Sequence, residues 1–432
     1  MSWQKVKLGD LCTIEKGKTG IQKAVPGEFP LVVTAEERKS HNEYQFDDEA
    51  VIIPLVSGTG HGHASIKRLH FQSGKFALGS ILSAVIPKDK SILNAEYLYR
   101  FLNLNKEREL VDKMKGIANV TLPIKEIAKI EIPLPSLEEQ IEFVEKYALL
   151  ETDSEDISFE LAHQLDLIKQ LRQAFLREAM QGKLVKSTNT KETGQQLLNK
   201  IKAEKAQLIA DKKLKKEKEL PPITADEIPF EIPDHWAWCR LGEICQFNPR
   251  NKADDNLDVG FCPMPLIYSD YKRNVDFEIR KWKSVKSGFT HFANNDVVFG
   301  KITPCFQNSK AAIINNLPNG IGAGTTELYV LRGFKGVNSG YIYNFIKDSN
   351  FLIEGERLMR GVAGQQRVPR EFVENSIIPI PPLHEQEQIV AKLEELMAFC
   401  EDLEQSIKES QGYNEKLLQQ VLREALQGKE KV

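Results

Sequence analysis

Three glycine-containing segments have residue types suited to phosphate binding, but none has the required spacing. Gly17–Thr19 reads Gly-Lys-Thr, the end of a phosphate-binding loop, yet Cys12 occupies the position of the loop's first glycine. Gly58–His63 and Gly320–Gly324 are rich in glycine, but neither fits the GxGxxG fingerprint between a strand and a helix. The sequence therefore contains no recognisable nucleotide-binding motif.

The remaining candidates for catalysis are three histidines, His61, His63 and His384, and the segment Thr303–Phe306, which follows a predicted strand. His384–Glu385 would open the zinc-protease helix motif, but Gln388 stands where the second histidine ligand is needed. His61 and His63 have no cysteine, aspartate or glutamate at ligand spacing nearby. Thr303–Phe306 lacks the Asn/Asp-Pro-Pro-Tyr sequence of adenine methyltransferases. We therefore predict no catalytic residue and no metal site, and interpret the chain as a non-enzyme.

Both halves of the chain contain polar loops suited to hydrogen bonding with DNA. Gln, Asn, Arg and Lys side chains bind base edges, while Ser and Thr hydroxyls bind phosphates. For any single residue, a place in an ordinary surface loop is a more common meaning than a DNA contact. Asn119, Thr121 and Gln365–Arg367 are stronger candidates for a DNA contact, because they occupy matched positions in the two halves. The predicted DNA-binding residues are Ser57, Thr59, His61, His63, Lys67, Arg68, Asn119, Thr121, Tyr268, Lys272, Arg273, Lys301, Thr303, Gln307, Asn308, Lys310, Gln365, Gln366 and Arg367.

Composition limits the class of protein. A chain of 432 residues with 41% hydrophobic residues predicts two to four domains with real cores. A net charge of −3 argues against a nucleic-acid binder that acts alone, which would show a basic excess. The six cysteines form no CxxC pair, and no apolar run suits a membrane span or a signal peptide. We expect a cytoplasmic protein with buried thiols.

The elements that must position these loops are duplicated. Ile132–Gln140 returns as Ile378–Gln386, and Phe175–Lys183 returns as Val421–Lys429, both at an offset of 246 residues (Leu137 to Leu383). No residue is inserted or lost between the two matches, which is what a spacer of fixed reach would show. The starts of the halves match at an offset of 233 (Trp3 to Trp236), so the second half is longer before its helix.

Each half is predicted to be a mixed domain of short strands and one short helix. The expected helices begin at Asn94 and Asn338, where asparagine is a plausible N-cap. Glycine-containing loops and a proline-flanked strand follow each of them. The expected strands include Ala50–Val56, Ser80–Ile86, Asp296–Ile302 and Thr326–Arg332.

Long helices are predicted after Pro135 and Pro382, with apolar residues at alternating steps of three and four. Gln164, Ser410 and Asn414 are polar positions in this seam, of the kind that fixes register. The alternative is two unrelated helices, each packed on its own domain; a rod of roughly 60 Å favours helix–helix pairing. The predicted seam is Tyr147, Leu150, Ile157, Leu161, Ile168, Leu171, Phe175, Leu393, Leu396, Cys400, Leu403, Ile407, Leu417 and Val421.

The predicted fold is therefore α+β, with two globular domains separated by two long helices that form an antiparallel coiled coil. We assign residues 1–136 and 235–382 to the globular domains, called domain A and domain B below. Residues 137–182 and 383–432 form the long helices, and 183–234 a lysine-rich helical linker. We interpret Lys202–Pro222 as a solvated helix that leads into a linker. A DNA or partner contact through Lys212, Lys213, Lys215 and Lys216 is the less common meaning of such a charge run.

The whole pattern resembles the DNA-specificity subunit of type I restriction–modification enzymes. The motifs that carry the resemblance are IPLPSLEEQ and IPIPPLHEQ before the long helices, LREAMQGKL and LREALQGK at their ends, and GKFALGSILSAVIPK in domain A. In domain B they are FCPMPLIYSD, GFTHFANNDVVFGKITPCFQNSKAAI and NGIGAGTTELYVLR. The linker Lys202–Trp238 is typical of one branch of these subunits.

The resemblance implies a non-catalytic reader of double-stranded DNA that serves in phage defence. The globular domains would be target recognition domains, each reading one half of a bipartite sequence. The helices would set the unspecified spacer between the halves and dock two methyltransferase subunits, which carry S-adenosylmethionine and methylate adenine at N6. Two restriction subunits with ATP and magnesium would complete the complex, and this chain would bind no cofactor itself.

Two other classes stay open at this point. One is a DNA methyltransferase or nuclease with its own undetected catalytic site, and the other is a structural coiled-coil protein without a DNA role. The target bases are not predicted, because recognition depends on docking pose and DNA shape as well as on side chains.

Overall fold

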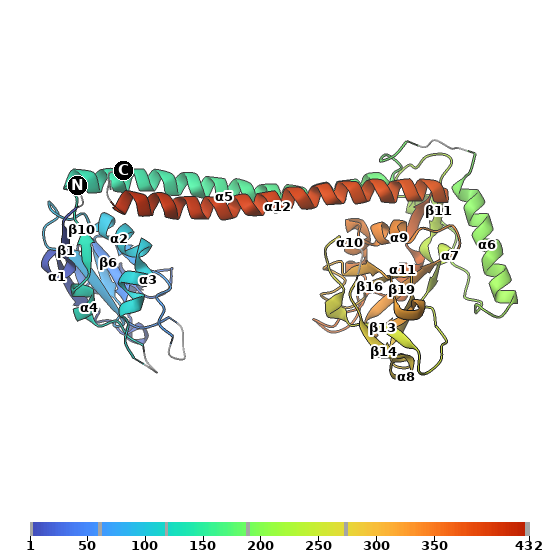
Figure 1. Cartoon of the computed structure of the whole chain (residues 1–432), viewed down its shortest axis with the longest axis horizontal. Coiled ribbons are helices and arrows are strands. Elements are labelled where there is room, and N and C mark those ends of the chain that lie inside the picture. The colour runs from blue at the N-terminus through green and yellow to red at the C-terminus, as the bar shows by residue number, and fades with distance from the viewer. Residues whose placement is uncertain (1–2, 59–62, 117–119, 187–190, 272–274, 428–432) are drawn as a thin grey trace. The chain divides into compact units, whose positions relative to one another are not determined.

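The computed structural model describes residues 3–58, 63–116, 120–186, 191–271 and 275–427. The chain divides into two units, residues 1–163 with 407–432, and residues 164–406 (Figure 1). Each unit holds one globular domain together with part of each long helix. These helices are α5 (Leu137–Met180, 44 residues) and α12 (Leu383–Gln427, 45 residues).

Domain A contains two four-stranded sheets and one strand pair. In the first sheet, order β2-β9-β6-β7, all neighbours are antiparallel; in the second, order β4-β3-β8-β5, β3 and β8 are parallel. Its elements are β1 (Lys5–Lys7), α1 (Leu8–Leu11), β2 (Cys12–Lys16), η1 (Ile21–Lys23), β3 (Phe29–Val32), β4 (Lys39–His41), β5 (Phe46–Asp47), β6 (Ala50–Pro54), β7 (His70–Gln72), β8 (Lys75–Leu78), β9 (Leu82–Pro87), α2 (Ala95–Leu104), α3 (Lys106–Glu109), η2 (Val111–Lys113), α4 (Ile124–Ala128) and β10 (Glu131–Pro133), which pairs with β1.

Domain B repeats this strand order element for element. Its sheets have the orders β12-β19-β16-β17 and β14-β13-β18-β15, β13 and β18 are parallel, and β11 pairs with β20. Its elements are β11 (Ala237–Arg240), α7 (Leu241–Ile244), β12 (Cys245–Phe247), β13 (Asp258–Cys262), η4 (Met264–Leu266), β14 (Glu278–Lys281), α8 (Trp282–Val285), β15 (Thr290–Ala293), β16 (Val297–Gly300), β17 (Ala311–Ile313), η5 (Pro318–Gly320), β18 (Ile321–Gly324), β19 (Leu328–Gly333), α9 (Ser339–Ile346), α10 (Ser349–Arg357), α11 (Arg370–Asn375) and β20 (Ile377–Ile380). The linker before it contains the short helix η3 (Ala225–Glu227).

The central strands and capped helices form for the reasons the sequence suggested. Every residue of β6 and β16 is buried, as expected of short continuous apolar strands. The Asn94 side chain accepts hydrogen bonds from the backbone N–H groups of Glu96 and Tyr97 at the start of α2. Asn338 caps α9 in the same way. The predicted asparagine caps are confirmed.

The repeated glutamine before each long helix is a structural residue. Gln140 is fully buried, donates from Nε2 to the carbonyls of Ile92 and Pro135 (both 2.9 Å), and accepts from the N–H of Asn94 (2.8 Å). Gln386 makes the corresponding three bonds, to Gly336, Pro381 and Asn338. Each glutamine therefore ties the start of a long helix to the capped start of the domain's short helix, which accounts for the repeated Glu-Gln sequence.

The linker helix begins before Lys202, the start of the segment predicted as a solvated helix, and its earlier turns contain buried residues. Residues 202–210 of the same helix are exposed or half-buried. Helix α6 (Gly194–Ala210) begins with a capping box, and Leu197, Leu198 and Ile201 are buried in the core of domain B. A Cβ at position 194 would lie 2.0 Å from the Ile380 carbonyl oxygen, so only glycine fits there. The lysines at 212, 213, 215 and 216 follow the helix and are exposed.

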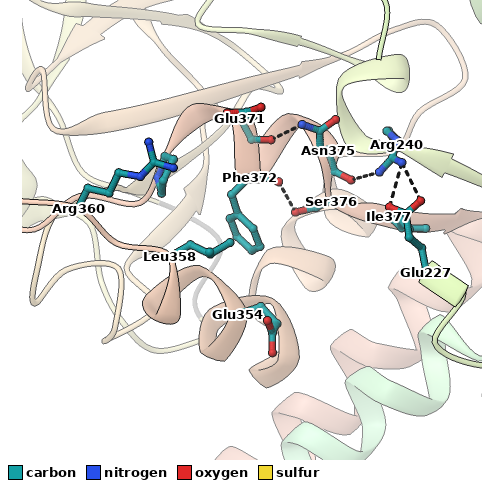
Figure 2. A pocket seen from close by; sticks show the side chains of 11 residues that line it. Glu227, Arg240, Glu354, Leu358, Arg360, Glu371, Phe372, Asn375, Ser376 and Ile377 are labelled. Carbon is teal, nitrogen blue, oxygen red and sulfur yellow. Dashed lines mark hydrogen bonds and ion pairs between the residues drawn. The ribbon is translucent and has the colours of Figure 1, made fainter. Parts of the chain in front are cut away.

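A buried arginine fixes the rest of the linker to domain B. Arg240 donates to the carbonyl oxygens of Pro221, Pro222 and Asn375 and pairs with the carboxylate of Glu227 at 3.0 Å. Arg240, Asn375 and Glu227 line part of the pocket that Figure 2 shows. Three carbonyl oxygens and one carboxylate together satisfy the N–H donors of the guanidinium, so we assign this pocket a structural role.

Candidate nucleic-acid interface

In each domain a buried central strand runs out into a loop that a later hairpin covers; we call this place the strand–hairpin junction. In domain A, the N–H of Ser57 donates to Val120 O, and the N–H of Leu122 donates to Leu55 O, both at 2.9 Å. A β-bridge also joins Val56 to Thr121. The junction brings together the predicted residues Ser57 and Thr121, which are distant in sequence.

Domain B has the same junction at an offset of 246 residues. The N–H of Thr303 donates to Gln366 O and the N–H of Val368 donates to Lys301 O, both at 2.9 Å. The β-bridge here joins Ile302 to Arg367. Four predicted DNA-binding residues, Lys301, Thr303, Gln366 and Arg367, therefore meet at one edge of domain B.

Hydrogen bonds within domain B orient the side chains at its junction. Arg367 donates from Nε and Nη2 to the two carboxylate oxygens of Glu327, each at 2.8 Å, and from Nη1 to Gln365 O. The ion pair lowers the pKa of Glu327, whereas burial lowers the pKa of Lys301. Thr303 Oγ1 accepts from the N–H of Gln366 at 3.1 Å. An arginine oriented in this way is preorganised for planar, bidentate recognition.

The other predicted residues of domain B lie on neighbouring loops and are mostly bonded within the domain. Tyr268 donates from its hydroxyl to Asp276, Lys310 donates to Met264 O, and Gln307 donates to Glu356. Asn308 is exposed. Lys272 and Arg273 lie outside the described residues.

The predicted residues of domain A are fewer, and those at its junction, Ser57 and Thr121, have small side chains. Ser57 Oγ donates to His63 O (2.6 Å) and accepts from the N–H of Ser65 (3.1 Å), which closes a turn. Arg68 pairs with Glu36 at 2.6 Å, while Lys67 and Thr121 are exposed. Thr59, His61 and Asn119 lie outside the described residues.

The long helices pack on each other within each unit. In one unit, Asn414 Nδ2 donates to Ser154 O (2.9 Å) and Ser158 Oγ (3.0 Å); in the other, Arg172 pairs with Glu404 at 2.7 Å. The order of these pairs is reversed along α12 relative to α5, so the helices are antiparallel, as predicted. Asn414 is buried, and its two bonds fix the register in the manner expected of a polar seam residue.

Burial along the predicted seam is uneven. Leu150, Ile157 and Leu417 are 38%, 47% and 62% exposed, because two helices alone cannot enclose a seam that drifts around a straight helix. The fully buried members include residues that contact a globular domain: Tyr147 lies under the Arg100 guanidinium of domain A, 4.3 Å from ring centroid to Cζ, and Leu393 belongs to the core of domain B. The buried seam residues are Tyr147, Ile168, Leu393 and Cys400, and the half-buried ones are Leu161, Leu171, Phe175, Leu396, Leu403, Ile407 and Val421.

Two kinds of residue at the interface were not predicted. Glu327 orients Arg367, and Lys347 lies behind the loops that carry Tyr268 and Lys310. Neither position stands out by spacing, because their partners are brought close only by the fold.

Comparison with known proteins identifies the family. The family model described as "Type I restriction modification DNA specificity domain" matches residues 1–152 and 233–410, which covers most of the chain. The chain belongs to this family. Both matched segments of the specificity-domain family contain one globular domain and the start of the long helix that follows it.

Curated relatives of the specificity-domain family come from Escherichia coli. The type I restriction enzyme EcoAI specificity subunit is 48% identical over 257 residues, which cover 59% of this chain and 44% of the relative. The EcoEI specificity subunit is 45% identical over 257 residues, covering 59% and 43%. The EcoDI specificity subunit is 23% identical over 441 residues, covering 99% and 88%. The matched region thus spans less than half the length of the first two relatives.

Two solved structures share the fold over almost the whole chain. One, described as "Structural basis underlying complex assembly and conformational transition of the type I R-M system", has a TM-score of 0.65 at 16% identity and covers 99% of this chain and 98% of that chain. The HsdS subunit from Thermoanaerobacter tengcongensis has a TM-score of 0.55 at 16% identity, covering 99% and 97%. The predicted fold class of two domains and long linking helices is confirmed.

Among the described residues, no helix is long and apolar enough to cross a membrane. No group of three or more His, Cys, Asp or Glu side chains is placed there to hold a metal ion.

Proposed function

We propose that this chain is the DNA-reading specificity subunit of a type I restriction–modification complex, and that it carries no catalytic site of its own. The observation that supports this most directly is the duplicated strand–hairpin junction. Two domains of one strand order present polar side chains at the same backbone position. One backbone frame with two different sets of side chains suits two different half-sites in DNA.

The side chains of the two junctions differ in size and charge, as expected if the two domains bind different DNA sequences. Domain B offers Lys301, Thr303 and Arg367, and arginine or lysine to guanine is the commonest base-specific contact. Domain A offers Ser57 and Thr121, which suit phosphate or general polar contacts. Each domain therefore reads one half of a bipartite target, and the bases between the halves are unspecified.

The long helices supply the spacing and the partner surface in this proposal. Their lengths of 44 and 45 residues are nearly equal, and Asn414 and Arg172 fix their register. A fixed register sets the number of base pairs between the half-sites. Two methyltransferase subunits with S-adenosylmethionine dock on the helices and methylate adenine N6, and two restriction subunits use ATP and magnesium.

Methylome sequencing tests the proposal. A host that carries this chain with its partner subunits should show adenine methylation at one split motif, and the motif should disappear when the chain is deleted. Exchange of residues 235–382 for the same region of a relative should alter one half of the motif and leave the other half and the spacing unchanged. An unaltered methylome on deletion would contradict the proposal.

A binding measurement separates this proposal from a fused enzyme. The isolated chain should show no S-adenosylmethionine binding by calorimetry, while the complex with its methyltransferase subunits should bind it. Saturable binding by the isolated chain would favour a methyltransferase with its own site.

A further inference from the structure

Lys347 is a buried lysine with no role in the junction. It follows helix α9 directly and is 1% exposed. Lysine is almost never buried to this extent unless its head group is paired. Burial lowers the pKa of its ammonium group to about 7. Burying an ammonium group is unfavourable unless hydrogen bonds compensate for the lost water. The contacts of the Lys347 head group must therefore account for its burial.

The head group joins two loops that carry predicted DNA-binding residues. Nζ donates to Ser269 O (2.9 Å), Asp270 O (2.8 Å) and Ser309 O (2.8 Å), and lies 3.1 Å from Ser309 Oγ. The first two carbonyls belong to the loop of Tyr268, and Ser309 lies between Asn308 and Lys310. Three carbonyl oxygens match the three N–H donors of an ammonium group.

The same place is tied to the long helix α5. Gln173 of α5 donates from Nε2 to the Tyr271 hydroxyl (2.9 Å) and to Lys347 O (3.3 Å), and its Oε1 accepts from the N–H of Ser349 (2.8 Å). Two cations lie near the Tyr271 ring, with Lys347 Nζ 5.2 Å and Arg172 Cζ 5.5 Å from its centroid. A continuous path of contacts therefore runs from the spacer helix to both loops.

We propose that Lys347 is a positioning residue for DNA recognition by domain B, because it clamps the loops at 268–271 and 307–310 to each other and, through Gln173 and Tyr271, to the spacer helix. This inference rests on the proposed function and adds to it a residue that touches no base. Its action is to fix the pose of Tyr268, Gln307, Asn308 and Lys310 relative to the helix that sets the spacing.

The test uses the complete complex with the full-length chain carrying Lys347→Met. Methionine has a similar reach but no donors, so the three carbonyls lose their common partner. We expect the ratio of methylation at correct sites to methylation at sites with one changed base to fall about tenfold in the half-site read by domain B. In the half-site read by domain A the ratio should stay within about twofold of the wild-type ratio. The exchange of residues 235–382 identifies which half-site is which.

Lys283→Met is the matched control. Lys283 is an exposed residue of helix α8 in the same domain, so the substitution is the same but removes no contact to the two loops. We expect wild-type ratios in both half-sites. A Lys347→Met complex with wild-type ratios, or with equal losses in both half-sites, would overturn the positioning role.

Tyr271→Phe covers the case in which the Lys347→Met chain does not fold. It removes only the hydroxyl that accepts from Gln173, and we expect a loss of about threefold confined to the same half-site. A folded Tyr271→Phe complex with unchanged ratios would then overturn the inference. A wild-type complex that methylates no split motif contradicts the proposed function itself, an outcome that needs no variant and is separate from these.

Discussion

Domains A and B have the same strand order but different chemistry at equivalent positions. At an offset of 246 residues, Leu55, Ser57 and Thr121 of domain A correspond to Lys301, Thr303 and Arg367 of domain B, while the backbone hydrogen bonds between them are the same. The backbone bonds hold the frame, so side chains at the junction are free to differ. Divergence at these positions is therefore compatible with an unchanged fold.

The two domains also differ in how their loops are supported. The chain between β13 and β15 is longer than the corresponding chain between β3 and β5, and this extra segment contains Tyr268 and Tyr271. Lys347 secures that segment in domain B. Counted from the caps Asn94 and Asn338, its counterpart in domain A is Asn103, which is exposed. The longer segment of domain B thus goes together with a buried lysine at a position where domain A has an exposed asparagine.

The largest expected effect concerns the ion pair between half-buried Arg332 and buried Asp296, which domain A replaces with apolar residues. Arg332 binds both carboxylate oxygens of buried Asp296 (2.8 and 2.7 Å), and the strand registers place Ile86 and Ala50 at the equivalent positions. Arg332→Ile should destabilise domain B by about 3 kcal/mol, because it leaves a buried carboxylate without its cation. Hydrogen exchange of domain B amides measures this.

The double variant Asp296→Ala with Arg332→Ile sharpens the same comparison. It recreates the apolar pair of domain A and should recover most of the loss, since replacing both partners of a buried ion pair is often close to neutral. If the double variant is as unstable as Arg332→Ile, the two domains are not interchangeable at this place.

A comparable effect concerns acid sensitivity in domain A. Burial, with Arg38 and Arg68 nearby, lowers the pKa of His70 from 6.5 to about 4. Between these values the unfolded chain binds a proton that the native domain does not, so stability is complete above pH 6.5 and falls as pH drops towards 4. The loss should approach about 3 kcal/mol at pH 4. His70→Gln should flatten the dependence, followed by hydrogen exchange of domain A between pH 4 and 7.5.

Smaller and equal effects are expected at the two buried glutamines. Gln140→Leu and Gln386→Leu each leave one N–H and two carbonyls without a partner, and each should cost about 2 kcal/mol in its own domain. Exposed Gln419→Leu should cost less than about 0.5 kcal/mol. Hydrogen exchange at the starts of α2 and α9 measures the two losses separately, and clearly unequal losses would show that the repeated motif has different roles.

The smallest expected effects are on recognition by the junctions. Arg367→Ala should weaken discrimination at one base pair by about 1–3 kcal/mol, because it removes a preorganised bidentate donor. Thr121→Ala, at the equivalent position, should cost less than about 1 kcal/mol, since one neutral hydrogen bond is lost. Binding of the complex to duplexes with single base changes measures both. Equal effects of the two variants would show that the junctions read DNA in the same way.

Local signals in the sequence were enough to predict the elements and their duplication. Asn94 and Asn338 were predictable as caps because an asparagine side chain satisfies N–H groups two and three residues away. The strand–hairpin junction was partly predictable, since matched spacing singled out Thr121 and Arg367 without showing what they contact. Burial of Leu197, Leu198 and Ile201 was not predicted, because only the fold brings the core of domain B against these residues next to a lysine-rich stretch.

What the sequence alone determined is the set of features that depend on near neighbours and on repetition: two copies of one domain, two helices of matched length, and the caps and prolines that bound them. The tertiary structure decided the features that depend on distant partners. Glu327 meets Arg367 across 40 residues, and Gln173 meets Ser349 across 176. The physical reason is that periodicity and capping act along the chain, whereas desolvation and hydrogen bonding in a core depend on which segments the fold brings together.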